Sequence, residues 1–185
     1  MMAMFFGIID VCYAVSIQSL LSAATRAGSR WAITYQSTYD GTTCASQAAC
    51  IAQVVQENAV GFLAGAKSGY VVVNYYIVNN LDTPVMTCSA GTCTASTIIT
   101  LPYTYTVNTG SGTTSVTVTY ANQPGNVVEV SVPAYPLIWM TPIAGFSAGN
   151  QVTDSSGHTG LGLTLSASAV DVLGGLPQGT TPPSP

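Results

Sequence analysis

The residue types that acid–base or nucleophilic catalysis needs occur together in one short segment of the chain. Asp154, Ser155, Ser156 and His158, the single histidine, lie close together in a glycine-containing polar stretch. Catalytic triads draw their members from separated elements, because the scaffold must hold each side chain in place. A histidine in such a loop is expected to be solvated. We therefore predict neither an enzyme, nor a cofactor, nor a small-molecule substrate, and an exported hydrolase that uses His158 is a minor alternative.

The five cysteines suggest a second kind of chemistry. Cys12 stands alone in an apolar segment, whereas Cys44 with Cys50 and Cys88 with Cys93 form two local pairs. Their spacing differs from the two-residue knuckles of zinc sites, and the histidine is distant, so no metal site is predicted. Disulfides are favoured, with free buried thiols as the alternative, and disulfides imply export to an oxidising compartment. Of the three possible connectivities, local pairing is the simplest.

Composition narrows the class of protein further. The chain has 185 residues, enough for one domain with a core, and 48% of them are hydrophobic. Only 5% are charged, against about 25% in ordinary soluble domains, so Thr, Ser, Asn and Gln must solvate the surface. The net charge of −4 and three basic residues exclude a nucleic-acid partner, because phosphates require clustered Lys and Arg.

Residues 1–33 are predicted to form a helix next to a membrane. The apolar run from Met1 to Ile17 is short of the roughly 20 residues that cross a bilayer. It has no basic leader and no cleavage site, so we expect an anchor, completed by residues upstream of Met1, rather than a signal peptide. Asp10 is expensive in lipid. It either marks the point where the helix leaves the lipid or pairs with a basic group of another helix.

The same helix has a predicted apolar face and a spacing of small residues that permits close packing. The predicted apolar face consists of Ile9, Tyr13, Ile17, Leu20, Ala24 and Trp31. The opposite, polar face consists of Gln18, Ser22, Thr25, Arg26 and Ser29. The pairs Ala23/Ala27 and Ala24/Gly28 let another backbone approach closely. That backbone belongs either to another membrane helix or to the chain's own sheet.

The remainder reads as an α+β domain. A second helix is predicted over 46–63, with Gly65 as its stop, and strands over 70–78, 96–107, 113–120, 126–135 and 161–173. Both helices are expected to pack on an antiparallel, meandering sheet of four to five strands, with Val128, Val130 and Val132 on one side. Residues 135–146 read as a proline-broken apolar loop. The predicted units are the helix 1–33, a head 34–175 and an unstructured tail 176–185.

Residues 5–32 closely resemble the N-terminal block of the TadE-like family of tight-adherence pilus assembly proteins. The family's glycine–aliphatic–aliphatic–acid element corresponds to Gly7, Ile8, Ile9 and Asp10. Its alanine–arginine–glycine–arginine signature corresponds to Ala24, Arg26, Ala27, Gly28 and Arg30. Asp10 stands where glutamate is usual and Ser29 where alanine is common. Residues 128–146 and 163–170 are similar to the family's strand, proline-broken loop and closing strand.

The resemblance implies a pilin-like fold and a minor pilin-like (pseudopilin) subunit of the Flp or type IVc pilus machinery. Its helix would sit in the bacterial inner membrane and its head in the periplasm or outside the cell. Its partners would be other pilin-like subunits and the inner-membrane assembly platform, contacted through Gly7, Asp10, Ala23, Ala24, Arg26, Ala27, Gly28 and Arg30. An exported adhesin or ligand-binding module is the alternative, suggested by ten tyrosines and Trp139.

Overall fold

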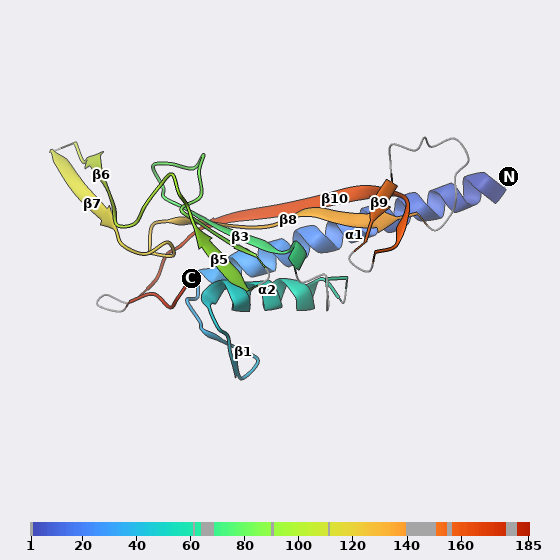
Figure 1. The fold of residues 1–185 in the computed structure, drawn as a ribbon, viewed down its shortest axis with the longest axis horizontal. Coiled ribbons are helices and arrows are strands. Elements are labelled where there is room, and N and C mark those ends of the chain that lie inside the picture. Colours follow the sequence, from blue (N-terminus) through green and yellow to red (C-terminus); the bar gives the residue numbers. More distant parts are fainter. Residues whose placement is uncertain are drawn as a thin grey trace.

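The computed structural model describes residues 2–60, 62–63, 69–89, 91–110, 112–139, 151–154, 157–176 and 181–185. Helix α1 (Met2–Ala32) lies between an antiparallel sheet and helix α2 (Gln47–Asn58), as Figure 1 shows. The strands are β1 (Thr38–Tyr39), β2 (Thr42–Thr43), β3 (Val72–Tyr76), β4 (Met86–Ser89), β5 (Thr92–Ala95), β6 (Tyr103–Asn108), β7 (Thr113–Val118), β8 (Val127–Ile138), β9 (Gln151–Thr153) and β10 (Thr159–Val172). The α+β class predicted from the sequence is confirmed.

Helix α1 is one continuous element of 31 residues and ends close to the predicted boundary. The backbone N–H and the hydroxyl of Thr34 both donate to the carbonyl of Trp31, at 3.0 and 2.7 Å. Tyr35 then adopts a left-handed backbone with a φ of 53°, which a further helical turn does not tolerate.

The buried face of α1 differs from the predicted one. Ile17 and Ala24 are buried as expected, but Thr25 and Ser29, assigned to the polar face, are 0% and 3% exposed. The Thr25 hydroxyl donates to the Ser22 carbonyl at 3.1 Å, and the Ser29 hydroxyl donates to the Arg26 carbonyl at 3.1 Å. Because the helix satisfies these hydroxyls itself, they enter the core without a partner from another element.

Helix α2 packs along α1 and not on the sheet, which corrects the expected arrangement (Figure 1). Ser46 caps its start, since the Ser46 hydroxyl accepts a hydrogen bond from the Ala49 N–H at 3.2 Å. It ends at Asn58, five residues before the predicted end, and Val60 has a φ of 49°. The expected stop, Gly65, lies outside the described residues.

The main sheet has six strands in the order β5-β4-β3-β8-β10-β9, all antiparallel, rather than four to five. It is not a meander, because β8 pairs with β3 across the intervening segment and β6 with β7 form a separate hairpin. Val128, Val130 and Val132 share one side, as predicted, and each is 0% exposed, so that side faces the core.

Strand β8 runs through the first part of the expected apolar loop. Pro136 pairs with Thr164 of β10, and the strand ends only at Ile138. Strand β3 pairs with β8 no further than Ser131. Beyond that point β8 pairs, among the described residues, with β10 alone. Proline cannot donate to a ladder and is tolerated on such an edge. Residues 140–146 of the expected loop lie outside the described residues.

Candidate functional site

The N-terminal half of α1 is an apolar rod whose large aliphatic and phenylalanine side chains are mostly exposed. Figure 1 shows this end of α1 extending past the ends of β8 and β10. The exposed fractions of its large side chains are 63% for Phe5, 43% for Phe6, 62% for Ile8, 41% for Ile9, 56% for Val11 and 64% for Val15. In contrast, Ile17 and Leu21 are 1% and 0% exposed. We call residues 5–15 the exposed segment of α1.

An apolar groove continues from the exposed segment toward the head. It has a volume of about 450 Å³ and lies between α1 and β10, lined by Ala14, Val15, Gln18, Ser19, Ser22, Leu163 and Leu165. The Gln18 side-chain amide crosses it and donates to the Ser166 carbonyl at 2.6 Å. This groove was not predicted. Leu163 and Leu165 belong to a predicted strand, and no local pattern shows which helix packs against it.

Asp10 lies on the covered side of the exposed segment. Its side chain is 2% exposed, whereas Ile9 and Val11 on either side are 41% and 56% exposed. Asp10 also has an interaction partner within the chain. An acid placed in this way is withheld from lipid, where an acid at the centre of a helix costs about 2.5–3.5 kcal/mol.

Apart from Asp10, the residues predicted to contact other subunits form two sets, an inner set that is buried in the chain and an outer set that is partly or fully exposed. Ala24 and Gly28 are buried in the chain's own core. A Cβ added to Gly28 would lie 2.5 Å from Val55 Cγ2 of α2 and 3.2 Å from Val130 Cγ1 of β8. Gly28 therefore permits close packing within one chain, and its expected use between subunits stays a prediction.

The outer set faces solvent. Ala23, Arg26 and Arg30 are exposed, and Ala27 is half-buried. Gly7 is half-buried, and nothing lies within 4 Å of a Cβ added to it. These five positions remain available to another molecule.

Two disulfides fasten the head. Cys44 is bonded to Cys50 and Cys88 to Cys93, which is the local pairing favoured by the sequence. The first joins the loop before α2 to the first turn of that helix, and the second joins β4 to β5. Disulfides persist in oxidising compartments, and the bonds therefore point to a head outside the cytoplasm. Cys12 is a free, exposed thiol on α1.

The catalytic residue types are adjacent but solvent-exposed. His158 Nδ1 lies 3.4 Å from Asp154 Oδ2, and its backbone N–H donates to Asp154 Oδ1 at 2.9 Å. The His158 side chain is 78% exposed. Ser155 and Ser156 lie outside the described residues. The pair forms a contact within the turn between β9 and β10.

A polar cluster on the outer face of the sheet was not anticipated. Glu129 Oε2 accepts hydrogen bonds from Tyr76 Oη at 2.8 Å and from Asn74 Nδ2 at 3.2 Å. Partial burial and then the hydrogen bond to Glu129 raise the pKa of Tyr76 to about 12. A cavity of about 250 Å³ opens beside Tyr76 and Glu129, and apolar Leu81 and Val170 border it. The cluster depends on pairing between β3 and β8, which are distant in sequence.

By length and composition, Phe5–Ala32 could cross a membrane, as a membrane anchor or as a signal sequence near the N-terminus. Within the described residues, no three His, Cys, Asp or Glu side chains gather as metal ligands. No family model, curated protein or solved structure matches this chain.

Proposed function

We propose that this chain is a membrane-anchored, non-enzymatic, minor pilin-like component of tight-adherence (Flp or type IVc) pilus assembly. In this proposal the exposed segment of α1 sits in the bacterial inner membrane or against the helices of other pilin-like subunits. The head is displayed in the periplasm or outside the cell. The resemblance of residues 5–32 to TadE-like proteins supports the proposal. The continuity of α1 also supports it, because the exposed segment and the part packed in the head belong to one helix.

The observation that carries the proposal is the change of environment along α1. From Phe5 to Val15 the large apolar side chains face outward, and from Ile17 onward one face of α1 is buried under α2, β8 and β10. Burying an apolar side chain of this size stabilises by about 1.5–3 kcal/mol. Soluble monomers rarely expose such a continuous apolar surface. A lipid bilayer or neighbouring apolar helices would cover it.

The exposed segment is tested by replacing Ile8, Val11 and Val15 with Asn in the full chain. We expect most of the protein to move from the membrane fraction to the soluble fraction. The matched control replaces the same three residues with Leu and should stay in the membrane fraction. The midpoint of thermal unfolding, measured by circular dichroism, should be the same in both variants, because the substitutions lie outside the head. Membrane retention of the Asn variant would refute the anchor.

The pilus role is tested separately in the producing cell. Deletion of the gene should abolish or shorten surface fibres in electron micrographs, and the wild-type gene should restore them. The Asn variant should not restore them, because its head would be released from the site of assembly. Normal fibres in the deletion strain would exclude an assembly role while leaving the anchor intact.

A display role as an adhesin is the second candidate, and the β6–β7 hairpin favours it. This hairpin projects from the end of the molecule opposite the N-terminus (Figure 1). The rings of Tyr103 and Tyr105 stack on it with centroids 6.3 Å apart, and the hydroxyls of Thr104 and Thr117 lie 3.0 Å apart. Binding of the purified chain to glycans or host surfaces, lost on replacing both tyrosines by Ala, would select this function.

A further inference from the structure

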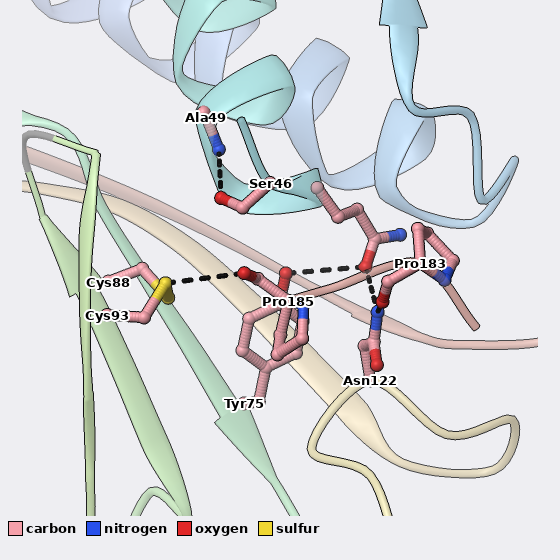
Figure 2. Close-up of a disulfide and its surroundings, with 9 residues drawn as sticks. Ser46, Ala49, Tyr75, Cys88, Cys93, Asn122, Pro183 and Pro185 are labelled. Carbon is pink, nitrogen blue, oxygen red and sulfur yellow. Dashed lines mark hydrogen bonds between the residues drawn. A yellow bond between two sulfur atoms is a disulfide. The ribbon is translucent and has the colours of Figure 1, made fainter. Parts of the chain in front are cut away.

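The last described residues of the chain, 181–185, lie against the start of α2 and the Cys88–Cys93 disulfide, as Figure 2 shows. In this segment, whose composition predicted an unstructured tail, Pro183 and Ser184 each present a carbonyl to a hydrogen-bond donor. Asn122 Nδ2 donates to the Pro183 carbonyl at 2.8 Å, and the Gln47 N–H donates to the Ser184 carbonyl at 2.8 Å. The Pro185 carbonyl oxygen lies 3.5 Å from Cys93 Sγ. We call Gln47, Cys93 and Asn122 the tail site.

The tail site is built from buried polar groups that support one another. Gln47 and Asn122 are each 0% exposed. Gln47 Nε2 donates to the Ala32 carbonyl at 2.8 Å, while Gln47 Oε1 accepts from Asn122 Nδ2 at 2.7 Å and from Tyr75 Oη at 3.4 Å. These bonds hold both amide side chains in fixed orientations, with Asn122 Nδ2 directed toward the tail.

The tail supplies acceptors that this part of the fold needs. Gln47 is the first residue of α2, and the first N–H groups of a helix have no partner within it. The hydroxyl of Ser46 accepts from the Ala49 N–H, which is a different donor of this first turn. The Ser184 carbonyl accepts from the Gln47 N–H, and without it this buried donor would be unpaired.

The manner of binding is that of a peptide ligand. Recognition runs through consecutive backbone carbonyls, while the prolines 182, 183 and 185 are half-buried and the side chains of Thr181 and Ser184 are exposed. Proline restricts the segment to extended conformations before it binds. Proline-containing segments are recognised in this way by grooves that hold polar and apolar contacts together.

We propose that the tail site is a peptide-binding site for extended, proline-containing segments. In a single molecule its ligand is the chain's own segment 181–185, and in an assembly its ligand is the same segment of a second copy. Every contact described above would be reproduced between copies, because donor and acceptor are identical in each chain, as in domain swapping. The proposal goes beyond the proposed function and stands without it.

The test compares the full chain with a chain that ends at Thr180, both in detergent, using a fluorescent peptide of residues 181–185 as the probe. We expect the shortened chain to bind the peptide, and the full chain to bind it about tenfold or more weakly, because its tethered segment competes. A peptide with Ser184 replaced by Ala should bind equally well, since that side chain is exposed. A peptide with Pro182 and Pro183 replaced by Gly should bind about threefold or more weakly.

Amide hydrogen exchange at Gln47 reports the same site directly. Its exchange should be faster in the shortened chain and should slow again when the peptide is added. If the shortened chain does not fold, the full chain with Pro182 and Pro183 replaced by Gly serves instead, because its weakened tail should free the site for the probe. Absence of peptide binding together with unchanged exchange at Gln47 would overturn the proposal.

Exchange between copies is tested by mixing a tagged chain ending at Thr180 with the untagged full chain. The tagged chain should retain the full chain on an affinity resin, and an excess of the free peptide should release it. Retention that the peptide does not release, or peptide binding without retention, would refute the second copy as ligand while leaving the peptide site in place.

Discussion

At the scale of single residues, Gly28 is a position where α1 packs closely against both α2 and β8. We expect Gly28→Ala to lower the free energy of unfolding by about 1–3 kcal/mol, the usual cost of overpacking. The added Cβ would lie 2.5 Å from Val55 Cγ2, and this clash should outweigh the roughly 1 kcal/mol that Ala contributes over Gly in a helix. Denaturant unfolding of the full chain in detergent measures the change.

Gly7 in the same helix is the matched control. No atom lies within 4 Å of a Cβ added there, so Gly7→Ala should be neutral or stabilise by up to about 1 kcal/mol. If Gly28→Ala and Gly7→Ala had the same free energy of unfolding, close packing at Gly28 would not contribute to stability.

Tyr76 and Tyr35 should make the fold sensitive to alkali. Burial raises the pKa of Tyr35 to about 12, and burial with the hydrogen bond to Glu129 raises that of Tyr76 to about 12, from an ordinary value of 10.0. The folded chain therefore holds these protons more tightly than the unfolded chain. Their contribution is complete below pH 10 and is lost as the pH rises through about 12.

We accordingly expect the midpoint of thermal unfolding to fall between about pH 10 and pH 12, and to fall less steeply in Tyr76→Phe. A Cys12→Ser background prevents thiolate attack on the disulfides during the measurement. An identical pH profile for Tyr76→Phe would mean that this phenol keeps its ordinary pKa in the folded chain.

At the scale of elements, the two disulfides fix short connections whose closure restricts the unfolded chain. Their sequence separations are 6 and 5 residues, and loops of this length contribute about 2 kcal/mol each in the chain-entropy model. Replacing Cys44 and Cys50 together by Ala should therefore lower the free energy of unfolding by about 2 kcal/mol.

The pair Cys88 and Cys93, replaced in the same way, provides the comparison. It should lose a similar amount by denaturant unfolding, because its loop is nearly as short. A negligible loss for either pair would indicate that the fold, and not the bond, restricts that loop.

The elements also show what the sequence alone could specify. The extent of α1 and the common side of Val128, Val130 and Val132 follow from local patterns, and both were predicted. The pairing of β3 with β8 joins residues 51 to 59 positions apart, and no local pattern encodes it. Strands β4, β5 and β9 have only three or four residues each, too few for a periodicity to be recognised.

The candidate site was predictable to a similar degree. An apolar N-terminal helix and the two disulfides could be read from composition and spacing. The spacing of Ala24 and Gly28 could not distinguish a neighbouring subunit from the chain's own α2, because both need the same close approach. Gln47 and Asn122 gave no signal, since polar residues are abundant in the body of the chain and their burial depends on distant contacts.

At the scale of the whole molecule, the state of the cysteines reports where the head resides. We expect the protein purified from the producing cell to take up one alkylating group after unfolding without reductant, because Cys12 alone of the five cysteines is a free thiol. After reduction it should take up five, one for each cysteine. Mass spectrometry of the intact chain distinguishes the two, and five groups without reduction would place the head in a reducing compartment.

Helix α1 has no break between the uncovered rod and the core, and the β6–β7 hairpin stands at the opposite end of the molecule (Figure 1). A swivel between anchor and head is therefore missing along these 31 residues. The tilt of the rod therefore also determines where the hairpin points. A rotation of a few degrees at the rod would displace the hairpin sideways at the opposite end of the molecule.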